Sequence, residues 1–172
     1  MRDHLASPQL IIMGRLTYEA LAQFVPSASD EVSTRMNALP KLVFSSTLEE
    51  PLAWKNTCLA NRTVADEIKA LKQGRGDLLR SIGSISLVKS MMQLGLVDRL
   101  GLMLFPLILG GAGREPICAG YPQASLELLN TRFLDSRIVL LKYRPVRPTA
   151  SYHPSCRTHF QTTFLASPPL LR

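Results

Sequence analysis

Histidine is scarce in this 172-residue chain, and its three copies lie near the ends, at His4, His153 and His159. A Ser-His-Asp or Cys-His catalytic arrangement within the body of the chain is therefore excluded. Cysteine is also rare: the three copies are widely spaced and form no CxxC pair. This usage predicts no disulfide framework and favours a reducing, cytoplasmic compartment.

Long apolar runs are missing as well. No stretch of about 18 apolar residues occurs, so we expect no transmembrane helix and no membrane partner. The opening 14 residues contain only a short apolar patch, too short for the apolar region of a signal peptide. The chain nevertheless is 46% hydrophobic and only 19% charged. Such a composition favours a folded core, and the length suits one domain.

Acidic residues are absent from the C-terminal segment, which explains much of the net charge of +7. From Arg144 to Arg172 there are four arginines and no acid, so residues 1–143 keep 16 basic and 13 acidic groups. The body is nearly balanced, which makes nucleic-acid binding an unfavoured hypothesis. We predict a domain over residues 1–145 and an irregular, proline-rich basic tail over residues 146–172.

Recognisable cofactor and metal motifs are lacking. Neither a GxGxxG fingerprint nor a Walker P-loop is present. His153, Cys156 and His159 form an HxxCxxH pattern in the tail. The pattern lacks a fourth ligand and lies in a segment with no regular periodicity, so we favour a polar tail over a metal site there.

What the body does contain is an alternation of short apolar runs and amphipathic segments. The runs predict strands at Leu10–Met13, Lys41–Ser45, Thr57–Ala60, Leu78–Ile82, Arg99–Leu109, Leu126–Leu134 and Arg137–Tyr143. Helices are predicted at Leu16–Phe24, Asp30–Leu39, Thr63–Gln73 and Ile85–Leu94. This order predicts a three-layer α/β fold with a mixed, mostly parallel central sheet and flanking helices. Pro106 places its strand at an edge or a bulge.

Two of the predicted strand-to-helix turns are rich in small and hydroxyl residues. They are Gly14-Arg15-Leu16-Thr17 and Gly83-Ser84-Ile85-Ser86. Helix N-termini suit phosphate, glycine lets the backbone approach an anion, and arginine adds a fork-shaped charge. From the residues alone, a plainer interpretation stays open, in which Ser84 caps a helix and Arg15 faces solvent.

Five segments, taken in order, resemble a known family. They are Gly14-Arg-Leu-Thr-Tyr-Glu19, Leu39-Pro-Lys-Leu-Val-Phe-Ser-Ser-Thr-Leu48, the turn at Gly83, Gly95-Leu-Val-Asp-Arg-Leu100, and Pro106 to Arg114. This series resembles the dihydrofolate-reductase-like superfamily, and within it the reductase domain of riboflavin biosynthesis (the RibD C-terminal domain) and its stand-alone relatives. Compared with that family, the chain is shortened at its N-terminus, and we expect the family's first strand to be lacking.

The resemblance implies NADPH as the cofactor and assigns it residues. Arg15 would bind the adenosine 2′-phosphate, and Thr17 the pyrophosphate beside the Gly14 backbone. Ser45 and Ser46 would line the adenosine phosphate pocket. Gly83, Ser84, Ile85 and Ser86 would hold the pyrophosphate and approach the nicotinamide ribose. No catalytic residue can be named.

Three hypotheses of function follow. The first is an NADPH-dependent reductase of a small heterocyclic substrate, ribosylaminopyrimidine-like or pterin-like. The second is a truncated, non-catalytic relative that keeps nucleotide or partner binding. The third is an interaction protein that uses its basic tail. The family also implies a homodimer, for which Met91, Met92 and the 102–109 strand offer apolar surface, unless these residues are core.

Overall fold

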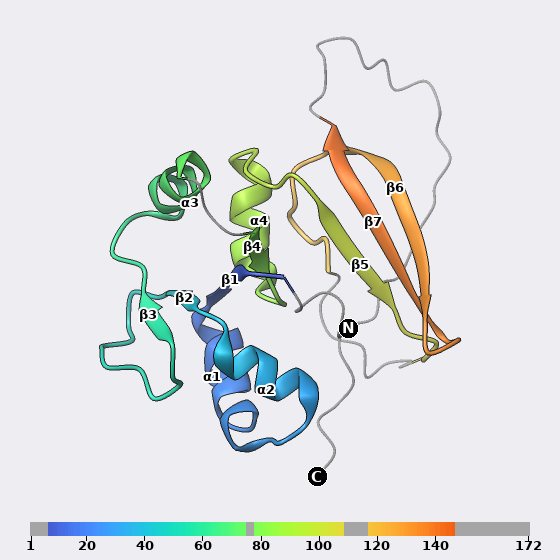
Figure 1. The fold of residues 1–172 in the computed structure, drawn as a ribbon. Coiled ribbons are helices and arrows are strands. Elements are labelled where there is room, and N and C mark those ends of the chain that lie inside the picture. Colours follow the sequence, from blue (N-terminus) through green and yellow to red (C-terminus); the bar gives the residue numbers. More distant parts are fainter. Residues whose placement is uncertain (1–6, 75–77, 109–116, 147–172) are drawn as a thin grey trace. The chain divides into compact units, whose positions relative to one another are not determined.

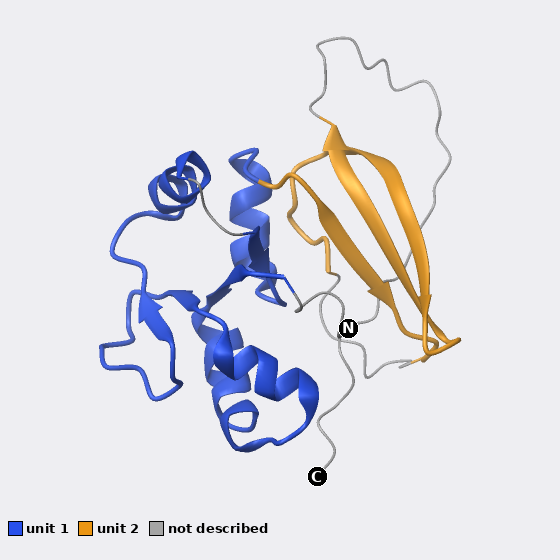
Figure 2. Cartoon of the chain, viewed as in Figure 1, with its two compact units in different colours: residues 1–96 blue, residues 97–172 orange. Residues whose placement is uncertain are grey.

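The computed structural model describes residues 7–74, 78–108 and 117–146. The chain divides into two compact units, residues 1–96 and residues 97–172, and each is described by itself (Figure 2). The predicted tail from residue 147 onward lies outside the described residues, as do the HxxCxxH pattern and the segment from residue 109 to Arg114. The boundary predicted after residue 145 thus stays a prediction.

The first unit is built on a four-stranded parallel sheet of order β3-β2-β1-β4. The strands are β1 (Gln9–Gly14), β2 (Lys41–Phe44), β3 (Thr57–Leu59) and β4 (Leu78–Ser81). β1 lies inside the sheet, where Ile12 pairs with Leu42 on one side and with Ser81 on the other. Burial on both faces explains why this strand is an uninterrupted apolar run.

Helices connect these strands and cover both faces of the sheet. They are α1 (Arg15–Ala22), the short 3-10 turn η2 (Val25–Ser27), α2 (Glu31–Ala38), α3 (Val64–Gln73) and α4 (Ile85–Gln93). Figure 1 shows α1 and α2 on one side of the sheet and α3 and α4 on the other. Asp30 caps α2 by accepting hydrogen bonds from two backbone N–H groups of the first turn, and Thr63 caps α3 by accepting one from Asp66 N–H.

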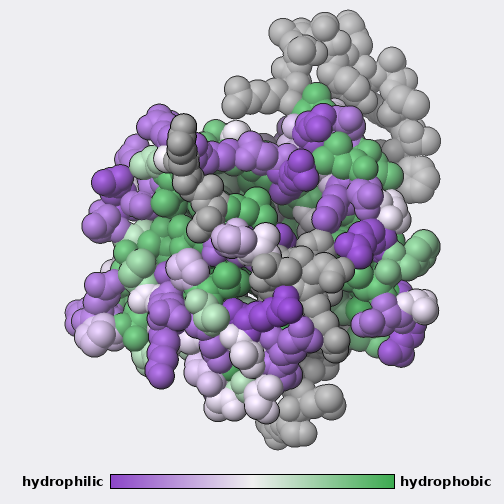
Figure 3. All heavy atoms as spheres, viewed as in Figure 1, coloured by the Kyte–Doolittle hydropathy of each residue, from purple (hydrophilic) through white to green (hydrophobic). Residues whose placement is uncertain are grey.

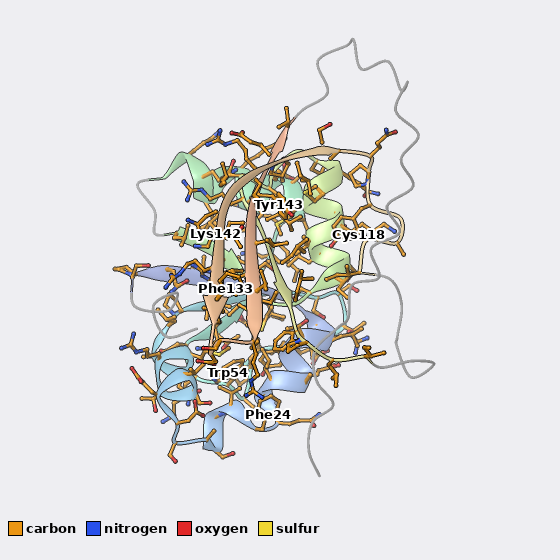
Figure 4. All side chains as sticks on the ribbon, turned by 90° about the vertical axis from the view of Figure 1, so that its right-hand side faces the viewer. Phe24, Trp54, Cys118, Phe133, Lys142 and Tyr143 are labelled. Atoms are coloured by element: carbon orange, nitrogen blue, oxygen red, sulfur yellow. The ribbon has the colours of Figure 1, made fainter. Side chains whose placement is uncertain are left out.

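Trp54 and Tyr18 are central to the core of the first unit, together with apolar side chains of β1 and β2. Their rings are stacked with centroids 6.4 Å apart, and both side chains are almost fully buried. Trp54, labelled in Figure 4, donates its indole N–H to Oδ1 of Asn37 at 2.7 Å. This partner satisfies the polar end of a ring that otherwise packs against apolar atoms.

Lys41 is the unexpected member of this core, because it is a fully buried cation at the start of β2. Its ammonium group donates to the carbonyl oxygens of Met36 at 2.9 Å and Leu39 at 2.6 Å, where α2 ends. It also lies 4.8 Å from the centre of the Trp54 ring. Burial nevertheless lowers the pKa of Lys41 to about 8.

The second unit is a three-stranded antiparallel sheet of order β5-β7-β6. Its strands are β5 (Leu100–Leu104), β6 (Ser125–Leu134) and β7 (Ile138–Val146). The register of β6 against β7 shifts between Leu128 and Asn130, which leaves Leu129 as the extra residue of a bulge. Asp135 and Ser136 have positive φ in the turn that joins the two strands.

The observed elements agree with the predicted α/β fold, and every predicted helix is present. Two details differ from the sequence prediction. The parallel and the antiparallel strands form two separate sheets, one in each unit, rather than one mixed sheet. β5 ends at Leu104, earlier than predicted, because Pro106 has no N–H to donate to a ladder.

Figure 3 shows hydrophilic and hydrophobic residues interspersed over the face it presents. Met91 and Leu102, both considered for a dimer surface, are buried in their own units. Leu107 and Ile108 of the same prediction are exposed, as is Phe133 on β6. The homodimer stays a prediction.

Candidate functional site

The position of β1 and β4 defines where a ligand can enter the first unit. The chain runs from β1 outward to β2 and β3, and then returns to place β4 on the other side of β1. The helices that follow β1 and β4 leave toward opposite faces of the sheet (Figure 1). In α/β proteins, ligands bind beyond the carboxyl ends of the strands at such a reversal of strand order.

Two hydrogen bonds join the turns that flank this reversal. The backbone N–H of Gly14 donates to Oγ of Ser84 at 2.9 Å. The backbone N–H of Ser84 donates in turn to Oγ1 of Thr17 at 3.0 Å. The two turns predicted from sequence as phosphate sites are therefore one structure, made by residues almost 70 positions apart.

The β4–α4 turn has an unusual backbone. Gly83 has φ of +64° and Ser84 has φ of +57°, so the left-handed region is occupied twice in succession. Glycine adopts this region at little cost, whereas serine does so under strain. Ser84 is the N-cap of α4, yet its side chain makes no capping bond, because its oxygen accepts from Gly14. The Ser84 side chain therefore binds the β1–α1 turn instead of capping its own helix.

The joined turns keep hydrogen-bond donors available to a ligand. In both bonds the hydroxyl oxygen of Ser84 or Thr17 is the acceptor, so the hydroxyl proton of each side chain can still be donated to an anion. Ser86 lies exposed in the first turn of α4, and Ile85 is 45% exposed beside it. With the positive ends of α1 and α4, these groups suit an anion of several phosphates.

Arg15, the predicted 2′-phosphate ligand, lies exposed at the start of α1. Its guanidinium group forms a forked pair with both carboxylate oxygens of Glu19, each at 2.9 Å. An exposed pair one helical turn apart is weak, so Arg15 can exchange this partner for a phosphate. Tyr18 of the same Gly14–Glu19 segment is buried in the core of the first unit.

Ser45 and Ser46 follow β2, the strand beside β1, and therefore reach the same edge of the sheet. Oγ of Ser45 accepts hydrogen bonds from the backbone N–H groups of Thr47 at 3.1 Å and Leu48 at 3.0 Å. Ser45 thus shapes the loop itself, while Ser46 is exposed. The structure therefore brings all nine predicted cofactor residues to one end of one sheet.

Comparison with known proteins gives this site a family. The family model of the RibD C-terminal domain matches residues 1–140. The chain belongs to the RibD C-terminal domain family. A curated relative, the uncharacterized protein YyaP of Bacillus subtilis, is 27% identical over 146 residues, which are 82% of this chain and 76% of that protein.

Solved structures of other proteins share the fold. A protein from Shewanella sp. PV-4 named for riboflavin biosynthesis has a TM-score of 0.65 at 19% identity, over 84% of this chain and 78% of its own. A pyrimidine reductase-like protein from Corynebacterium diphtheriae has a TM-score of 0.58 at 13% identity, over 83% and 77%. At these identities the likeness establishes the fold, and the roles of side chains must come from the chain's own geometry.

Sequence reasoning missed two features of the site. Leu16 is 70% exposed between Arg15 and Thr17, which leaves an apolar side chain in the same turn as the proposed phosphate ligands. The tie between Gly14 and Ser84 was also missed, since only the pairing of β1 with β4 brings them together. Within residues 7–74, 78–108 and 117–146 no group of three His, Cys, Asp or Glu side chains could hold a metal, and no helix there is long and apolar enough to cross a membrane.

Proposed function

We propose that this protein is an NADPH-dependent reductase of a small heterocyclic compound, pyrimidine-like or pterin-like. The observation that carries the proposal is the joined pair of turns at the reversal of strand order, where Ser84 bonds to both Gly14 and Thr17. In a family of reductase domains, a multi-phosphate cofactor is the ligand that best matches this chemistry.

Each part of the site has a role toward the cofactor. The Gly14 backbone, Thr17 and the 83–86 turn would hold the pyrophosphate, and Ser86 would extend toward the nicotinamide ribose. Arg15 would bind the 2′-phosphate that distinguishes NADPH from NADH, with Ser45 and Ser46 around the adenosine. When bound, the cofactor supplies the hydride, and the protein supplies position and electrostatics.

The class of substrate is inferred from relatives. The Shewanella protein is named for riboflavin biosynthesis and the Corynebacterium protein as pyrimidine reductase-like. Leu16 and Ile85 add exposed apolar surface beside the phosphate-binding turns, which suits a flat ring. A nitrogen heterocycle reduced at a C=N or C=O bond fits both observations.

A titration with NADPH and with NADH tests the cofactor. We expect saturable binding of NADPH, with enhanced nicotinamide fluorescence and thermal stabilisation. Ligand at 100 times its dissociation constant stabilises the folded state by about 2.7 kcal/mol. If neither nucleotide shifts the melting temperature or the fluorescence, the proposal is wrong.

Turnover separates the two hypotheses that share this fold. A reductase oxidises NADPH, with loss of absorbance at 340 nm, when supplied with the pyrimidine substrate of riboflavin biosynthesis or with a dihydropterin. A non-catalytic relative binds NADPH with the same Arg15 dependence but leaves the absorbance unchanged with both substrates.

A further inference from the structure

The second unit contains a basic groove of about 420 Å³, lined by Arg99, Leu129, Asn130, Arg132, Lys142 and Arg144. We propose that this groove binds a small phosphorylated anion, with two or more negative charges. The proposal concerns residues of the antiparallel sheet alone and does not depend on the proposed reductase activity. Four of the six lining side chains are cations, and no acid is among them.

The strand register explains why these cations meet. Lys142 and Arg144 are two residues apart on β7 and therefore point to the same face of the sheet. Asn130 pairs with Lys142, and Arg132 follows two residues later on β6. Arg99 directly precedes Leu100, which pairs with Tyr143, so it reaches the sheet beside Arg144. The alternation of side chains along β6 and β7, together with Arg99 just before β5, thus places the four cations close together.

The bulge and a glycine give the groove its space. The register shift between Leu128 and Asn130 leaves Leu129 unpaired, and such a bulge turns two successive side chains toward one partner. Leu129 and Asn130 accordingly both line the groove. Gly101 pairs with Lys142 from β5 and carries no side chain that could cover it.

The charge of the groove is only partly compensated. Glu127 pairs with Arg144 at 3.1 Å, and both side chains are more than half exposed. Lys142, which Figure 4 labels on β7 beside Tyr143, is half-buried, and its ammonium group has no acceptor within the described part of the chain. Like charges gathered on one sheet face destabilise the sheet, and a bound anion relieves that repulsion.

The dimensions favour a small ligand over a nucleic acid. A groove of this volume is in the range of small-molecule sites. A nucleic-acid backbone instead needs a basic stripe that continues along a surface. Here a buried apolar residue interrupts the cations on β7, since Leu140 lies two positions before Lys142 and pairs with Arg132. The positive region is therefore confined.

Calorimetric titration with inorganic pyrophosphate at about 50 mM salt tests the proposal. We expect a binding event that is weakened about tenfold or more by Lys142→Gln and by Arg99→Gln, because each removes a charged hydrogen-bond donor. Arg137→Gln, which removes the same charge from the β6–β7 turn outside the groove, is the matched control and leaves the affinity unchanged. Circular dichroism establishes that each variant is folded.

Three results would overturn the proposal. They are the absence of saturable binding, equal weakening by Arg137→Gln, and loss of binding on Gly14→Ala, which adds a methyl group where the cofactor's pyrophosphate is proposed to lie, with no effect of Lys142→Gln. The last result would place pyrophosphate at the joined turns of the first unit. Tighter binding of a thymidine oligonucleotide of about 20 residues than of pyrophosphate would also overturn it, in favour of a nucleic-acid surface.

Discussion

The backbone N–H of Ser84 donates a 3.0 Å hydrogen bond to Oγ1 of Thr17, although 67 residues separate them in sequence. The bond ties the N-terminus of α4 to the first turn of α1. The bond therefore holds the starts of the two helices together before a ligand binds. Rigid placement of binding groups reduces the entropy lost on binding.

Thr17→Val tests this tie, because valine keeps the shape of threonine but cannot accept a hydrogen bond. The Ser84 N–H is then left without its partner in a largely buried position. We expect a loss of about 1–2 kcal/mol in the free energy of unfolding, measured by urea denaturation. Thr17→Ser keeps the acceptor and should lose much less. If Thr17→Val is as stable as the wild type, the hydrogen bond to Ser84 does not contribute to the free energy of unfolding.

Ser84 affects the free energy of unfolding in two opposing ways: its hydroxyl accepts a stabilising hydrogen bond, and its left-handed backbone is strained. Two variants separate these effects. Ser84→Ala removes the acceptor of Gly14 N–H and keeps a Cβ at a φ of +57°. Ser84→Gly removes the same acceptor but relieves the left-handed strain. We expect the glycine variant to be more stable than the alanine variant by about 1 kcal/mol. An alanine variant as stable as the glycine variant would contradict the backbone conformation described here.

Arg15→Ala tests the discrimination between the two nicotinamide cofactors. Loss of a charged hydrogen bond to the 2′-phosphate should weaken NADPH by about 1.5–3 kcal/mol and leave NADH nearly unchanged. Glu19→Gln is the matched control, because it removes the partner that holds Arg15 in the free protein. It should leave NADPH binding unchanged or slightly tighter. Equal weakening of both nucleotides by Arg15→Ala would exclude the proposed role.

Much of this architecture could be predicted from sequence, because local signals determine it. The apolar run of β1, the cap at Asp30 and the glycine turns each predict an element from a few neighbouring residues. The basic groove escaped prediction for a physical reason. Acids and bases nearly cancel over residues 1–143, whereas the groove depends on strand register, which brings Arg99, Arg132 and Lys142 together.

Lys41 illustrates the second limit of sequence reasoning. The apolar run predicts only that Lys41 begins a strand, whereas in the structure its side chain is fully buried and binds carbonyl oxygens at the end of α2. The three carbonyl acceptors near its ammonium group come from a helix end whose position depends on tertiary packing. The residues adjacent to Lys41 in sequence therefore do not indicate that its ammonium group will bind these carbonyl oxygens.

The buried state of Lys41 predicts a pH dependence of stability. Its pKa is about 8 in the folded protein, against 10.5 for an unperturbed lysine. Between these values the unfolded state binds more protons than the folded state, so this group makes stability rise with pH. Relative to Lys41→Met, the wild type should gain ~1.4 kcal/mol per pH unit across that interval. Urea denaturation from pH 7 to pH 10 measures this, and a constant difference would contradict it.

Gly14→Ala separates binding from folding at the candidate site. Gly14 has φ of −86°, which alanine adopts freely, and a Cβ there would meet no protein atom within 4 Å. We therefore expect the free energy of unfolding to change by less than ~1 kcal/mol. That open space is where the pyrophosphate is proposed to lie, so the added methyl group should weaken NADPH by about tenfold, or ~1.4 kcal/mol. Gly74→Ala, near the end of α3 and away from the joined turns, is the control and should leave NADPH affinity unchanged. If Gly14→Ala binds NADPH as tightly as the wild type, the cofactor does not approach the Gly14 backbone, and the phosphate-binding role of this turn must be abandoned.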